Sequence, residues 1–126
     1  MSTKILMVFC DETDLWKREE RLYEAIVRKL HRAGIAGATV LRGLMGYGVH
    51  RRIHKKGLFG VSDETPILIL AIDEEDKLRN ILPVLLPMVK EGLINLVDTE
   101  VLSYGADRRD PLSSAVAPDP SDGPAA

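Results

Sequence analysis

The chain has 126 residues, 45% of them hydrophobic and 29% charged, with a formal net charge of −2, which is the balance of one globular domain with a buried core. Its single cysteine, Cys10, excludes an intrachain disulfide and suits a reducing compartment. The longest apolar stretch, residues 81–89, is too short to span a bilayer, and the N-terminus lacks a signal-peptide pattern. We therefore expect a cytoplasmic protein with no membrane insertion.

The first half of the chain predicts a strand, a helix and a second strand. Residues 4–10 form a continuous apolar run, the pattern of a strand buried on both faces. From about Glu19 the apolar residues take helical spacing, and Gly34 stands where a left-handed C-cap belongs. Residues 37–44 favour a second strand, and a long glycine-rich, basic stretch at residues 43–60 follows.

The second half repeats the strand, helix and strand order. Residues 66–72 predict a third strand that is apolar on both faces. Asp73 is the predicted N-cap of a second helix that ends at Gly92, with a kink or break near Pro83. Residues 93–102 predict the fourth strand.

This order, β-α-β-β-α-β, predicts an α+β ferredoxin-like fold, with two helices on one face of an antiparallel four-stranded sheet. The domain is expected at residues 1–104, followed by a disordered Pro/Asp/Ala-rich tail at residues 105–126. In this topology the first and third strands are central, and here both are apolar throughout. The helix-free face therefore needs a cover, and we expect sister subunits to provide it.

The basic stretch is the candidate ligand site. Residues 37–62 hold five basic residues and no acidic one. Glycines let backbone N–H groups approach a ligand, and Arg or Lys side chains supply charge-assisted bonds to phosphate, so the pattern favours anion binding. A solvated flexible loop is the alternative interpretation. The candidate ligand-binding residues are Arg42, Gly43, Gly46, Gly48, His50, Arg51, Arg52, His54, Lys55 and Lys56.

Other chemistries find less support in the sequence. His50 and His54 have the i, i+4 spacing of two metal ligands, but no third ligand stands nearby in a known pattern, so we predict no metal site. Cys10 follows an apolar strand and is expected to be buried. No Ser/His/Asp spacing and no P-loop pattern is present, so we predict no catalytic residues and no enzyme activity.

Residues 37–78, GATVLRGLMGYGVHRRIHKKGLFGVSDETPILILAIDEEDKL, closely resemble the PII-like bacterial proteins known as domain of unknown function 190. The segments LYEAIVRKLHRAGIAGATV and EGLINLVDTEVL extend the resemblance over residues 4–103. It implies a trimeric ferredoxin-like fold related to the PII nitrogen-signalling proteins. In those relatives the loop between the second and third strands docks onto transporters or enzymes, and nucleotides bind between subunits near its base.

For this chain the resemblance implies a homotrimeric regulator that senses an adenine nucleotide (ADP, ATP or AMP) and acts on a transporter or enzyme. No other cofactor is expected. Relatives are often encoded beside fluoride channels, which suggests a membrane partner, and Tyr47 is a position where modification can be tested. One departure is that PII proteins carry a second glycine-rich phosphate loop, where this chain has only residues 90–92 between helix and strand.

Two other classes remain as alternatives. A metal-responsive trimer like the CutA proteins would use His50 and His54. An RNA-binding module shares the fold but stacks bases on aromatic residues of the central strands, which here offer only Phe9. We therefore expect no nucleic-acid partner.

Overall fold

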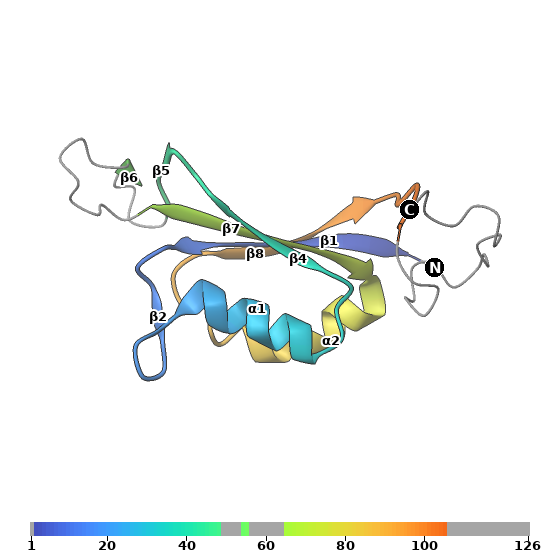
Figure 1. The fold of residues 1–126 in the computed structure, drawn as a ribbon, viewed down its shortest axis with the longest axis horizontal. Helices are drawn as coiled ribbons and strands as arrows, with labels where there is room; N and C mark the ends of the chain where they lie inside the picture. The colour runs from blue at the N-terminus through green and yellow to red at the C-terminus, as the bar shows by residue number, and fades with distance from the viewer. Residues whose placement is uncertain (1, 49–53, 56–64, 106–126) are drawn as a thin grey trace, which may run out of the picture.

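The structure is a computed structural model that describes residues 2–48, 54–55 and 65–105. The fold is α+β and ferredoxin-like, as predicted: in the described residues a four-stranded antiparallel sheet carries two helices on one face (Figure 1). The strand order is β4-β7-β1-β8, so the predicted first and third strands are indeed the central pair. The main elements are β1 (Thr3–Asp11), α1 (Leu22–Arg32), β4 (Ala38–Arg42), β7 (Pro66–Glu74), α2 (Glu75–Leu85) and β8 (Leu93–Thr99).

Four two-residue strands add to this framework. The connector after β1 holds a hairpin of β2 (Leu15–Trp16) and β3 (Glu20–Arg21), which the sequence did not predict. Its tip places Arg18 and Glu19 at φ 60° and 66°, a left-handed conformation that is unfavourable for residues with a side chain. After β4, the strands β5 (Met45–Gly46) and β6 (His54–Lys55) pair within the predicted loop.

The first helix follows its sequence pattern. Its buried stripe consists of Leu22, Ala25, Ile26 and Leu30. Gly34 has φ 78°, as predicted for the residue after the C-cap. The second helix differs from expectation: it continues through Pro83 without breaking and ends two residues later, at Leu85. Pro83 lacks the N–H that would bond the carbonyl of Arg79, and the helix continues for only two residues beyond it; Leu86, Pro87 and Met88 lie in a turn.

Asp73 is not the N-cap of α2, and that prediction is wrong. The N-cap is Glu74, without a side-chain capping bond, while Asp73 is the last inward position of β7 and is fully buried. Its carboxylate accepts hydrogen bonds from the amides of Ala36 (3.0 Å) and Glu74 (2.7 Å) and pairs with Lys77 at 2.8 Å. These three partners offset the cost of burying the charge, and the bond to Ala36 ties the end of β7 to the α1–β4 turn.

Burial alternates along the central strands. On β1, Leu6, Val8 and Cys10 are buried, whereas the residues between them are only half-buried. Strand register groups the outward side chains into one surface, which we name the open face. Both faces of the central strands are therefore apolar, as expected. The open face consists of Ile5, Met7, Phe9, Thr39, Leu41, Leu68, Leu70, Ile72, Leu93, Asn95 and Val97.

Neither helix in the described ranges has the length and apolar character that a membrane crossing requires. The tail predicted at residues 105–126 falls outside those ranges apart from Gly105, so its predicted disorder stays a prediction.

Candidate functional site

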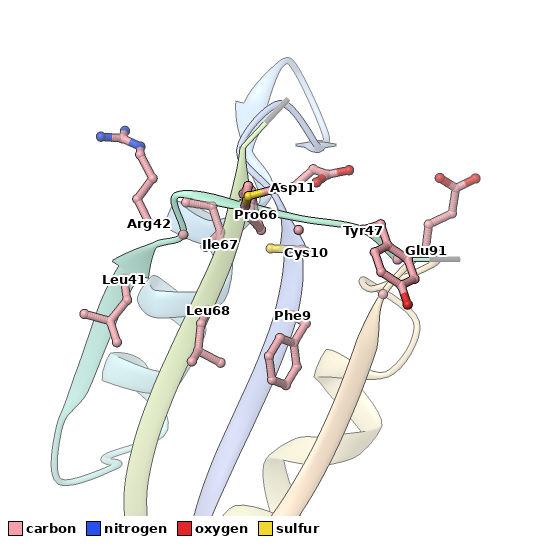
Figure 2. Close-up of a pocket in the computed structure, with 15 residues that line it drawn as sticks. Phe9, Cys10, Asp11, Leu41, Arg42, Tyr47, Pro66, Ile67, Leu68 and Glu91 are labelled. Carbon is pink, nitrogen blue, oxygen red and sulfur yellow. The ribbon is translucent and has the colours of Figure 1, made fainter. Parts of the chain in front are cut away.

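A pocket of about 550 Å³ lies at the end of the sheet where β1 finishes, β7 starts and β4 leads into β5 (Figure 2). This volume falls within the usual range for a small-molecule site. Together with the link before β8, four separate segments of the chain therefore meet at one hollow. The described lining residues are Phe9, Cys10, Asp11, Leu41, Arg42, Gly43, Met45, Gly46, Tyr47, Gly48, Pro66, Ile67, Leu68, Glu91 and Gly92.

The pocket borders the open face. Phe9 pairs with Leu68 in the sheet, and Leu68 pairs with Leu41, so the three side chains form one row across β1, β7 and β4. All three belong to the open face and also line the pocket. Figure 2 shows this row below the glycine-containing segment that carries Tyr47. A molecule covering the open face would therefore come close to the pocket.

Gly43 joins the two ends of the β4–β7 loop. Its amide donates a hydrogen bond to the carbonyl of Pro66 at 2.7 Å. A Cβ at Gly43 would lie only 2.8 Å from Cγ of Pro66, so a side chain would push the two ends apart. The glycine is therefore required for close packing, and its N–H is already used rather than offered to a ligand.

Arg42 is paired with Glu12 in the turn after β1. Its Nε donates to one carboxylate oxygen at 3.1 Å and its Nη2 to the other at 2.5 Å. This hydrogen bonding from Arg42 holds the pKa of Glu12 below its usual value. Figure 2 shows the guanidinium directed away from the rings of Phe9 and Tyr47. Arg42 thus lines the pocket without turning its charge toward these rings.

The pocket interior is mainly apolar. Beside Arg42, its charged residues among those described are Asp11 and Glu91, which are both acidic. Burial, assisted by the nearby charges of Asp14 and Asp11, raises the pKa of the Cys10 thiol to about 12. The thiol is buried, as expected, and remains protonated near neutral pH. A flat, uncharged group fits this interior better than a phosphate does.

The structure brings together part of the predicted ligand site. Arg42, Gly43, Gly46 and Gly48 all line the pocket. The backbone of β6 pairs His54 with Gly46 and Lys55 with Met45. The other four candidates, His50, Arg51, Arg52 and Lys56, lie outside the described residues. No cluster of three or more potential metal-ligating side chains occurs among the residues described. His50 and the side chain of His54 lie outside the described part of the structure, so their predicted lack of a metal stays a prediction.

Sequence reasoning missed the residues that the fold brings to the pocket from β1 and from the link before β8. Phe9 was recognised only as a strand residue, although antiparallel pairing places the end of β1 beside the start of β7. Glu91 and Gly92 belong to a link that runs from Leu86 to Gly92. The sequence predicted a shorter link of residues 90–92, and the difference arises because α2 ends early, at Leu85. The link still contains a single glycine, unlike a glycine-rich phosphate loop.

Comparisons with known proteins agree with this fold. The DUF190 family, described as "Uncharacterized ACR", matches residues 3–101. The UPF0166 protein MJ1524 of Methanocaldococcus jannaschii is 36% identical over 102 residues, covering 80% of this chain and 93% of that protein. A UPF0166 protein of Aquifex aeolicus is 32% identical over 99 residues, covering 79% and 92%.

Among solved structures, the chain is similar to CPII, a nitrogen regulatory PII-like protein from Thiomonas intermedia K12, bound to ADP, AMP and bicarbonate. That match has a TM-score of 0.63 and 23% identity and covers 80% of this chain and 89% of CPII. CPII bound to ADP, AMP and acetate matches with a TM-score of 0.57 and 23% identity, over 79% and 87%. At such low sequence identity, the structural similarity establishes the fold alone. The chain therefore belongs to the DUF190 family and has the fold of PII-like proteins.

Proposed function

We propose that this chain is a regulatory protein that binds an adenine nucleotide at the base of the β4–β7 loop and signals through that loop. One observation carries the proposal: a largely apolar pocket of about 550 Å³ lies at the base of this loop, at the end of the sheet. CPII, which shares the fold, is described as bound to ADP and AMP, and this supports the choice of ligand.

The charges suggest how the nucleotide is oriented. Phe9, Leu41 and Leu68 offer apolar surface to a base, while Asp11 and Glu91 repel phosphate. The phosphates would then point toward the basic part of the loop, where Arg51, Arg52, Lys55 and Lys56 follow one another closely in the sequence. The ligand would thus span an apolar pocket and a cationic loop.

The open face supports a homotrimer, because its eleven positions are apolar except for Thr39 and Asn95. Ile72, Leu93 and Val97 on this face are 38%, 53% and 39% exposed in the isolated chain. An apolar surface of this extent is usual at subunit contacts. Its single aromatic residue, Phe9, offers little for stacking RNA bases.

We further propose that the protein acts in the cytoplasm and is not an enzyme, so that the bound nucleotide is sensed rather than converted. The loop would dock on a transporter, a channel or an enzyme when its conformation responds to the nucleotide. Incubation of ATP with the protein, followed by chromatography of the nucleotides, tests whether the protein converts the nucleotide. Turnover at a constant rate would contradict it.

Calorimetry with ADP, AMP, ATP and adenosine tests the binding. Each charge-assisted contact contributes about 1.5–3 kcal/mol, so Arg51→Ala with Arg52→Ala should weaken ADP binding at least about tenfold. Adenosine binding should change little, because adenosine carries no phosphate. The matched control, Lys29→Ala with Arg32→Ala on α1, removes the same charge and should leave ADP binding unchanged.

Failure of wild type to bind any of the four ligands would refute the proposal. Equal loss of ADP binding in both double variants would instead indicate a general charge effect. Binding of Zn²⁺ or RNA without nucleotide binding would favour the metal-responsive or RNA-binding alternative.

A further inference from the structure

We propose that Glu12 is a positioning residue that holds both ends of the β4–β7 loop against β1 and thereby shapes the pocket. This proposal rests on the proposed nucleotide-binding function and adds a residue that does not line the pocket. Arg42 is the last residue of β4, immediately before the loop, and Thr65 is the last residue before β7. Glu12 contacts both.

The contact with the first loop end is the bidentate pair with Arg42, in which both carboxylate oxygens are engaged. Bidentate pairing fixes orientation as well as distance, because two parallel bonds must be kept at once. The side chain of Glu12 is 28% exposed and that of Arg42 is 51% exposed. The pair therefore acts mainly through geometry, since solvent weakens its attraction.

The contact with the second loop end uses backbone and side chain. The amide of Glu12 donates to the carbonyl of Thr65 at 2.8 Å, and the Thr65 side chain is hydrogen bonded to the Glu12 carboxylate. Thr65 is only 3% exposed. Arg21 of the β2–β3 hairpin adds a longer bond to the Glu12 carbonyl, at 3.5 Å. We name these contacts the Glu12 clamp.

The clamp matters for the pocket because Glu12 directly follows the strand segment that forms one wall. Phe9, Cys10 and Asp11 line the pocket from β1, and Met45 and Tyr47 line it from the first part of the loop. The bond between Gly43 and Pro66 joins the loop ends to each other, whereas the clamp joins both of them to β1. Releasing the clamp would let one wall move relative to the other.

Three variants test this role. Glu12→Ala removes the side-chain contacts with Arg42 and Thr65, and Glu12→Gln keeps the shape but loses the charge. The matched control is Glu20→Ala, because Glu20 accepts Nε and Nη2 of Arg28 at 3.2 and 2.7 Å in the same bidentate manner without contacting the loop ends. Circular dichroism and the melting temperature first establish that each variant folds.

The first readout, amide hydrogen exchange, needs no ligand. The amide of Gly43, which bonds the Pro66 carbonyl, should exchange at least about fivefold faster in Glu12→Ala than in wild type, because local opening becomes easier. It should not change in Glu20→Ala. Unchanged exchange in Glu12→Ala would overturn the clamp, whatever the nucleotide result.

The second readout is calorimetry with ADP. We expect Glu12→Ala to bind about five- to tenfold more weakly, Glu12→Gln to fall between, and Glu20→Ala to stay within about twofold of wild type. Higher affinity in Glu12→Gln than in Glu12→Ala at equal melting temperature would separate positioning from a general loss of stability. Faster exchange with unchanged ADP affinity would refute the positioning role.

If wild type does not bind ADP, the proposed function fails, while hydrogen exchange still decides whether the clamp holds the loop ends.

Discussion

Two valines with nearly equal exposure allow a sharp test of the open face. Val97 on β8 is 39% exposed and belongs to that face, and Val84 on α2 is 41% exposed on the helical side. We expect Val97→Asp to dissociate the proposed homotrimer and Val84→Asp to leave it intact. If the isolated chain were the functional unit, Val97→Asp and Val84→Asp would both have similarly small effects on the stability of the fold.

The magnitude follows from the exposure. Full burial of a valine side chain contributes about 1.5–3 kcal/mol, so covering the remaining 39% of Val97 contributes about 0.6–1.2 kcal/mol per subunit. Burying an unpaired carboxylate in its place costs several kcal/mol more. We therefore expect a loss of about 3–5 kcal/mol per subunit, or at least about a hundredfold in the association constant.

Light scattering after size exclusion, at about 10 μM protein, measures the outcome, and circular dichroism establishes that Val97→Asp still folds. Wild type and Val84→Asp should elute as trimers and Val97→Asp as a monomer. A trimeric Val97→Asp, or a monomeric wild type, would refute the inference that the open face is a subunit contact.

Three further predictions concern the isolated fold. Gly92→Ala should lower stability by about 1–3 kcal/mol in denaturant unfolding, because a Cβ there would lie 2.2 Å from the carbonyl oxygen of Phe9; an unchanged midpoint would contradict this close approach. Arg18→Asn with Glu19→Gly should raise stability by about 1 kcal/mol, since both positions have positive φ, and a loss would mean that the native side chains stabilise the turn. Cys10 should react with a thiol reagent at pH 8 only after denaturant is added, because its pKa is raised to about 12 and it is buried; fast labelling of the native protein would be incompatible with that burial.

The sequence predicted the main elements because their patterns are regular. The stripe on α1 and the apolar runs of β1 and β7 led directly to the observed fold and its central strand pair. The β2–β3 hairpin was missed because its tip, Arg18–Glu19, lacks the glycine or asparagine that usually marks such a turn. Local pattern alone cannot reveal a turn that is held by its surroundings.

Asp73 and Glu12 show why the site was only partly predictable. Asp73 looked like an N-cap because an acidic run follows a strand, yet its carboxylate serves the distant amide of Ala36. Glu12 was not singled out in the sequence, because its bond to Arg42 spans 30 positions. The glycines and Arg42 were found because they cluster along the chain, whereas the pocket residues from β1 and the α2–β8 link come together only through the sheet.

The pairing of Thr3 with Thr99, reinforced by the hydrogen bond from the Thr3 hydroxyl to the Thr99 carbonyl at 2.8 Å, has a practical consequence. The first and last strands of the sheet have their outer ends side by side, and the pocket lies at the opposite end of β1. The nine residues of β1 span roughly 30 Å at about 3.3 Å per residue. A short peptide that replaces residues 100–126 and joins these neighbouring strand ends would produce a circular permutant that keeps the strand pairing, with new ends at the β2–β3 tip. A fluorescent reporter attached beside Thr3 or Thr99 would likewise stand clear of the pocket and leave its entrance unobstructed.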